Sequence, residues 1–229
     1  MGFRGWSHRG YLPHCDYPGL VQFVTIRLAD SLPQSCRLEW EPLLAIEDDR
    51  EKRAKLEQFL DRGLGECHFR NSRVAAIAES ALLHFHGARY ELLAWCVMPN
   101  HLHVLVGVWN VPLWKIVRSW KQFIATKAET VIAERRPPAR LEGERIPVEP
   151  ARRAALRVQR LRWQRECWDT YMRDEKQERT AIRYIENNPL KAILCRAPED
   201  WPFTSARFRD SYMRLRLPTK VNSQVREAR

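Results

Sequence analysis

The sequence lacks any segment long enough to cross a membrane. Its longest uninterrupted apolar run, residues 92–99, is far shorter than the ~20 residues needed to span a bilayer. The first ten residues contain two arginines and no apolar stretch of the kind found in secretory signals. We therefore expect a cytoplasmic protein that does not associate with membranes.

Paired cysteines and glycine-rich loops are also missing. The six cysteines are scattered, with no CxxC pair, which argues against a zinc module or a disulfide framework. Glycine occurs only nine times, and no Walker motif or glycine-rich phosphate loop is present. Nothing in the sequence therefore predicts a nucleotide cofactor.

Positive charge, by contrast, is abundant. Lysine and arginine number 39 against 28 acidic residues, for a net charge of +11, a balance typical of proteins that bind nucleic acid. Membrane surfaces and acidic partners attract the same charge. Ten arginines lie between Arg135 and Arg165, among several prolines. This segment has two open interpretations, a solvated linker and a nucleic-acid contact surface.

The hydrophobic pattern predicts one main domain over residues 21–212. It is preceded by a basic N-terminal arm without periodicity, residues 1–20, interrupted by an Arg/Pro-rich insertion at about residues 134–162, and followed by a basic tail, residues 213–229. Strands are expected at 21–28, 91–97, 101–108 and 166–172, and helices within 39–60, 72–85, 111–133 and 174–187. This order favours an α+β fold, an antiparallel sheet with helices on one face.

Two histidines stand on the strand expected at residues 101–108. Because alternate side chains of a strand share a face, His101 and His103 point the same way. Two imidazoles so spaced can bind one divalent cation, although a pair of purely structural histidines fits the same pattern. His84 and His86 have identical spacing in a helical pattern, where they point about 200° apart, and we expect them to be structural.

A tyrosine and an asparagine stand one helical turn apart near the end of the last helix. Tyr184 and Asn188 occupy neighbouring positions on one helix face. Pro189 leaves the end of this helix undefined, because the residue before a proline disfavours helical geometry. On chemistry alone, four other tyrosines remain alternative nucleophiles. They are Tyr11, Tyr90, Tyr171 and Tyr212.

Together these motifs resemble those of the REP-associated tyrosine transposases, which belong to the HUH single-strand transposases. The resemblance rests on His-Leu-His after Trp95-x-x-x-Pro99, Tyr184-Ile-x-x-Asn188-Pro189 and Asp200-Trp201-Pro202. It extends over about residues 9–205, apart from most of the insertion. It implies a ferredoxin-like sheet of the HUH endonuclease type.

The resemblance also implies a chemistry. Tyr184 would attack single-stranded DNA and form a 5′-phosphotyrosine, leaving a 3′-OH that can later rejoin. His101 and His103 would hold Mg²⁺ or Mn²⁺, with Asn188 as a third ligand where relatives often carry Gln. The expected substrate is single-stranded or hairpin-forming, REP-like DNA, and the protein would be nucleoid-associated and either a monomer or a homodimer.

DNA contacts and rival functions stay open at this level. Lys121, Lys127, Arg4 and Arg9 are candidate DNA contacts and equally solubilising charges. One rival is a non-catalytic DNA- or RNA-binding regulator derived from a transposase. Another is a structural metal protein without affinity for single strands.

Overall fold

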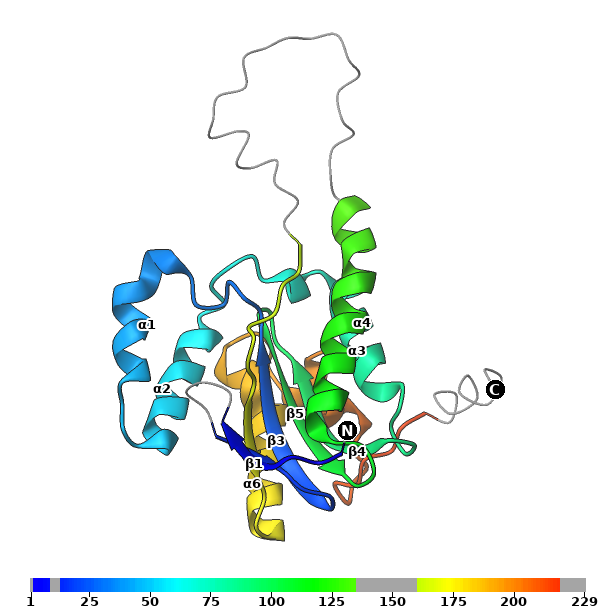
Figure 1. Cartoon of the computed structure of the whole chain (residues 1–229). Helices are drawn as coiled ribbons and strands as arrows, with labels where there is room; N and C mark the ends of the chain where they lie inside the picture. The colour runs from blue at the N-terminus through cyan, green and yellow to red at the C-terminus, as the bar shows by residue number, and fades with distance from the viewer. Residues whose placement is uncertain (1, 9–12, 135–159, 219–229) are drawn as a thin grey trace, which may run out of the picture.

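The structure is a computed structural model that describes residues 2–8, 13–134 and 160–218 (Figure 1). Most of the Arg/Pro-rich insertion, the end of the tail, Arg9 and Tyr11 therefore lie outside the described residues. None of the helices within those ranges is long and apolar enough to cross a membrane.

The centre of the fold is a four-stranded antiparallel sheet. Its strands are β3 (Leu20–Arg27), β4 (Tyr90–Val97), β5 (His101–Val108) and β6 (Trp168–Tyr171). They are ordered β4-β5-β3-β6, the arrangement of a ferredoxin-like sheet. The predicted α+β class and antiparallel sheet are confirmed, and all four strands lie where their patterns placed them.

Helices cover both faces of this sheet, which corrects the expectation of helices on one face. Helices α3 (Ser72–Leu83) and α4 (Leu113–Glu134) pack on one face, while α6 (Glu175–Lys191) packs on the other against β4 and β5. In Figure 1, α4 passes in front of the sheet and α6 behind it. Helices α1 (Arg37–Leu44) and α2 (Asp49–Asp61) stand beside it.

The second covered face follows from the side chains of the central strands. Leu102, Val104 and Val106 contribute to the larger core beneath α3 and α4. The opposite face carries a smaller apolar set that Ala181 and Ile185 of α6 cover. That set is Phe23, Ala94, Cys96, Met98 and Leu105. Because every residue of β5 is buried, the histidine face is an interior surface.

The N-terminal segment also differs from its prediction. Instead of an arm without periodicity, it forms an antiparallel hairpin of β1 (Gly5–His8) and β2 (Pro13–Asp16). The buried Asp16 carboxylate accepts hydrogen bonds from the Arg4 amide, at 3.0 Å, and the Leu113 amide, at 3.2 Å. Leu113 begins α4, so this contact joins the hairpin to a helix N-terminus, where negative charge is favourable.

Four short 3₁₀ helices complete the described elements. They are η1 (Gln34–Cys36), η2 (His68–Arg70), η3 (Pro198–Asp200) and η4 (Ser205–Phe208). The last of these lies against β4, where the Ser205 hydroxyl accepts a hydrogen bond from the Trp95 amide at 3.0 Å. The segment after α6 thus secures the edge strand of the sheet.

Helix α6 begins at the predicted cap and runs past its expected end. The Asp174 carboxylate accepts from the Gln177 amide at 2.8 Å, which satisfies an amide without a helical partner. The helix continues through Pro189 to Lys191, whereas the sequence pattern placed its end at residue 187. The longer helix keeps Asn188 in helical register with Tyr184.

Removing the cap should weaken α6 measurably. We expect Asp174→Ala to lower the free energy of unfolding by about 1 kcal/mol, and Asp174→Asn to retain most of it, because asparagine caps equally well. Chemical denaturation of the three proteins measures both values. Equal losses in the two variants would show that the carboxylate acts by its charge and not as a cap.

Candidate active site

The two strand histidines lie side by side beneath α6. His101 and His103 are both fully buried, and their Nε2 atoms are 3.0 Å apart. They share the face of β5 that α6 covers. The predicted common orientation of the pair is therefore present, at an interior position between strand and helix.

Each ring is held through its other nitrogen. The Asn100 Oδ1 lies 2.8 Å from His101 Nδ1, and the Thr25 hydroxyl lies 3.0 Å from His103 Nδ1. The Asn100 Nδ2 donates to the carbonyls of Leu60 and Leu64, which fixes its amide so that Oδ1 accepts the proton of His101 Nδ1. The Nε2 atom of His101 thus presents a lone pair.

Burial keeps both rings neutral. It lowers the pKa of His101 to about 3, with the charge of Arg27 adding to the effect. Burial likewise lowers the pKa of His103 well below its usual value, assisted by His101, Arg53 and Lys191. Neutral imidazole is the form that binds a metal ion.

Tyr184 lies next to this pair. Its ring centroid is 5.7 Å from that of His103 and 5.8 Å from that of Phe23. The Lys191 ammonium stands 4.5 Å from the ring centroid. The side chain is half-buried, so the helix holds the phenol at the margin of the site and not within the core.

The phenol hydroxyl meets a carboxylate that the sequence patterns did not single out. It donates to Glu57 Oε2 of α2 at 2.5 Å. Glu57 is only 6% exposed, and burial raises its pKa, while Tyr184, Arg53 and Lys191 oppose the rise. Since 127 residues separate Glu57 from Tyr184, no local pattern could have identified the contact.

A second acidic residue accompanies Glu57 one turn along α2. Burial, followed by the charge of Glu57, raises the pKa of Asp61 to about 7. Burial also raises the pKa of the Tyr184 phenol well above its usual value, and the charges of Glu57 and Asp61 add to this. In the structure the phenol therefore retains its proton.

Asn188 is fully buried on α6, the helix that carries Tyr184. It lies near enough to the Tyr184 hydroxyl to oppose the rise of the phenol pKa slightly. Even so, neither its Oδ1 nor its Nδ2 completes a hydrogen bond. A buried amide without hydrogen-bond partners is unfavourable, and an oxygen-binding cation would provide a partner for Oδ1.

The three alternative tyrosines that lie within the described ranges, Tyr90, Tyr171 and Tyr212, have different surroundings. Tyr90 is 2% exposed, its hydroxyl donates to the Leu82 carbonyl at 2.7 Å, and burial raises its pKa to about 12. Tyr171 ends β6 with its ring against Trp6. Tyr212 is largely exposed near the C-terminal end of the described chain. Among these, Tyr184 alone has a ring contact with His103 in the described structure.

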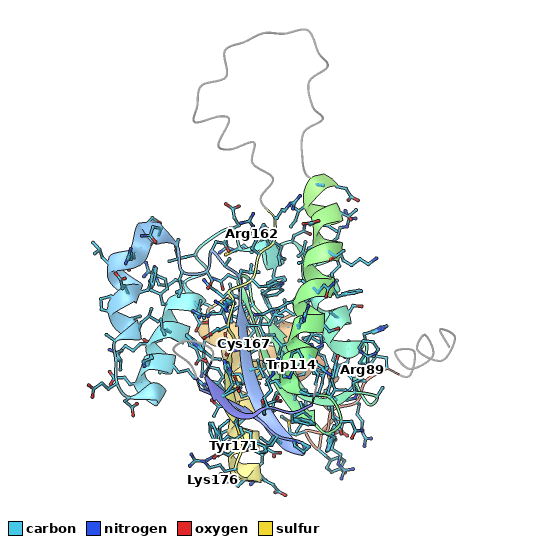
Figure 2. The ribbon with its side chains drawn as sticks, viewed as in Figure 1. Arg89, Trp114, Arg162, Cys167, Tyr171 and Lys176 are labelled. Atoms are coloured by element: carbon cyan, nitrogen blue, oxygen red, sulfur yellow. The ribbon has the colours of Figure 1, made fainter. Side chains whose placement is uncertain are left out.

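The candidate DNA contacts do not gather at this site. Arg4 and Lys121 line a cleft of about 720 Å³ between α4 and the N-terminal hairpin, beside β6. Trp114 and Cys167, labelled in Figure 2, belong to the same lining. The Lys121 ammonium donates to the Gln164 and Arg165 carbonyls, so it joins α4 to the chain entering β6. Lys127 is exposed on α4.

The donors present suit a divalent cation with few protein ligands. Within the described ranges, no three histidine, cysteine, aspartate or glutamate side chains form a metal cluster. The candidate donors are the two neutral imidazoles and, on the helix that covers them, the amide oxygen of Asn188. Adjacent donors of an octahedral ion at about 2.1 Å lie about 3.0 Å apart, which matches the two Nε2 atoms. Their spacing equally suits a hydrogen bond between the rings.

Comparison with known proteins adds a likeness in structure. The sequence matches no protein-family model and no curated protein. The structure is similar to that of a REP-associated tyrosine transposase bound to a REP hairpin, with 16% sequence identity and a TM-score of 0.47, over 90% of this chain and 87% of that one. That transposase belongs to the family that the sequence motifs of this chain resemble.

Proposed function

We propose that this protein cleaves and rejoins single-stranded DNA in a metal-dependent reaction through a 5′-phosphotyrosine. The observation that supports this most is the meeting of Tyr184 with His103, at a ring separation of 5.7 Å. The two residues come from different elements, α6 and β5. A phenol beside two neutral imidazoles provides a nucleophile and cation ligands at one place.

The cation would be held by His101 Nε2, His103 Nε2 and, as a third ligand, Asn188 Oδ1. When bound, Mg²⁺ or Mn²⁺ supplies positive charge against the oxygens of the phosphate under attack. Asn100 and Thr25 orient the two rings through their Nδ1 atoms. Such outer partners commonly determine how well a ligand set binds its ion.

Tyr184 performs the covalent step. Its hydroxyl oxygen bonds to phosphorus as the hydroxyl loses its proton, and the bond from phosphorus to the 3′-oxygen breaks. The products are a 5′-phosphotyrosine and a strand ending in 3′-OH after that oxygen gains a proton. Attack of a 3′-OH on the phosphotyrosine reverses the step, so rejoining requires no nucleotide cofactor.

Trapping the covalent intermediate tests this function. Purified protein is incubated with a labelled hairpin oligonucleotide bearing single-stranded flanks, with Mg²⁺ or Mn²⁺, and then denatured. We expect a denaturant-resistant adduct whose DNA-linked peptide contains Tyr184. Salt-dependent binding without any adduct would instead support the rival function, a DNA- or RNA-binding regulator. Absence of single-strand binding would contradict the proposed function and favour the other rival, a structural metal protein.

We further propose that flanking single-stranded DNA follows the cleft beside α4. The cleft combines cations, Arg4, Arg118 and Arg165, with the aromatic rings of Trp114 and Trp163. Three acidic residues, Asp16, Glu166 and Asp169, also line it, and Asp16 and Asp169 are hydrogen-bonded within the protein. Cations and aromatic rings together are the usual means of holding single strands. Arg118 is exposed on α4. Its side chain offers a better probe than Lys121, whose ammonium already bonds to two carbonyls.

Two exposed cations on α4 make a matched test of this path. Arg118 lines the cleft, and Lys127 lies nine residues on, about 180° around the helix. We expect Arg118→Ala to weaken single-strand binding. The slope of the logarithm of the binding constant against the logarithm of the salt concentration should fall in magnitude by about 0.7, the value for one phosphate contact. Lys127→Ala should change binding less. The opposite ranking would place the strand on the outer face of α4.

A further inference from the structure

The contact between α2 and α6 joins a carboxylate to the hydroxyl of the proposed nucleophile. Glu57 Oε2 accepts the hydrogen bond of the Tyr184 hydroxyl at 2.5 Å. This separation is at the short end of hydrogen bonds from a hydroxyl to a carboxylate. Glu57 Oε2 thus accepts a hydrogen bond from the phenol oxygen, which has to lose its proton in the proposed function.

The surroundings of Glu57 suit a group that receives a proton. The carboxylate is almost fully buried, and its other oxygen, Oε1, makes no hydrogen bond. The cations of Arg53 and Lys191 favour its charged form, while burial favours its neutral form. A buried carboxylate with opposed influences of this kind can exist in either form during a reaction.

We propose that Glu57 is the general base that takes the phenol proton of Tyr184 during DNA cleavage and returns it during rejoining. This inference rests on the proposed function. In cleavage, the proton moves from the phenol oxygen to Glu57 Oε2 as that oxygen bonds to phosphorus. The 3′-oxygen leaves with the electron pair of its bond to phosphorus and gains a proton from water. Rejoining reverses each transfer.

Asp61 provides a matched control for Glu57. It lies on the same helix one turn away, its carboxyl group is largely withdrawn from solvent, and its Oδ1 makes no hydrogen bond. The Tyr184 hydroxyl, however, donates to Glu57. Above pH 7, where Asp61 is ionised, loss of negative charge near the phenol is therefore common to Glu57→Gln and Asp61→Asn. Loss of the carboxylate bonded to the phenol belongs to Glu57→Gln alone.

Single-turnover cleavage of a hairpin oligonucleotide with single-stranded flanks measures the effect. We expect Glu57→Gln to slow adduct formation by about 100-fold or more, the usual contribution of a general base. Asp61→Asn should slow it far less. Thermal unfolding and single-strand binding by each variant establish that both are folded, and Glu57→Gln is nearly isosteric with the native side chain.

A modified substrate separates activation of the nucleophile from assistance to the leaving group. Replacing the scissile 3′-oxygen with sulfur provides a leaving group that departs without a proton. We expect the defect of Glu57→Gln to persist on this substrate, because the phenol still has to lose its proton. Restoration of the wild-type rate would show that Glu57 assists the leaving group and would overturn the proposal.

The remaining outcomes are equally decisive. A Glu57→Gln variant that cleaves as fast as the wild type, or faster, would overturn the proposal and show that the contact only restrains the phenol. In that case a wild-type adduct at Tyr184 would leave the proposed function intact. Absence of any adduct in the wild type would refute the proposed function itself, and this inference with it.

Discussion

Tyr184→Phe should abolish the covalent protein–DNA adduct and leave single-strand binding nearly unchanged. Phenylalanine removes the hydroxyl that would bond to phosphorus, and no other atom of that ring can replace it. The ring contacts with His103 and Phe23 remain available to phenylalanine, so the packing of α6 should survive. Denaturing electrophoresis of labelled DNA measures the adduct, and a binding titration supplies the companion value.

Tyr171→Phe is the control for this substitution. Tyr171 is likewise half-buried, at the end of β6, and was an alternative nucleophile on chemistry alone. We expect its variant to form the adduct at the wild-type level. An adduct that persists in Tyr184→Phe and disappears in Tyr171→Phe would identify Tyr171 as the nucleophile and refute the assignment to Tyr184.

Loss of either strand histidine should remove divalent-dependent cleavage. Replacing a residue that only orients a metal ligand commonly lowers metal affinity or activity about 10–100-fold. Because His101 and His103 would themselves be ligands, we expect His101→Ala and His103→Ala each to lower the cleavage rate by at least about 100-fold. Each change removes one of the two Nε2 atoms that stand 3.0 Å apart. Cleavage rates over a Mn²⁺ titration test this, with EDTA expected to stop the wild-type reaction.

His84→Ala is the matched control, because His84 belongs to the other His-x-His pair and is exposed just beyond the end of α3. It should leave cleavage unchanged. Because His101 and His103 are buried, thermal unfolding of both alanine variants identifies any loss that is due to misfolding. Undiminished cleavage in EDTA, or in folded variants of both histidines, would exclude the proposed metal site.

Local sequence patterns were sufficient for the four strands of the central sheet, for the helices that pack on it and for part of the site. Alternation of apolar residues located β5, and the period of two placed His101 and His103 on one face. The helical period and the Asp174 cap located α6 and the face that carries Tyr184. These features depend on residues within a few positions of one another, which is why they are readable from the sequence.

Only the tertiary structure decided which residues meet around the phenol. Glu57 reaches Tyr184, and Thr25 reaches His103, across 127 and 78 residues of sequence. A lone acidic residue in a charged helix has no pattern that distinguishes it from a solvated one. The pairing of β3 with β5 brings Thr25 to His103, and the contact of α2 with α6 brings Glu57 to Tyr184.

The burial of the second face of the sheet by α6 is the feature that most clearly required the tertiary structure. The sequence by itself determined an α+β chain with a histidine pair on one strand and a tyrosine on its last long helix. It did not determine that α6 lies on the histidine face, because both faces of β5 become buried and burial depends on what packs against them. The tertiary structure placed α6 there, and that placement brings the phenol to the histidines.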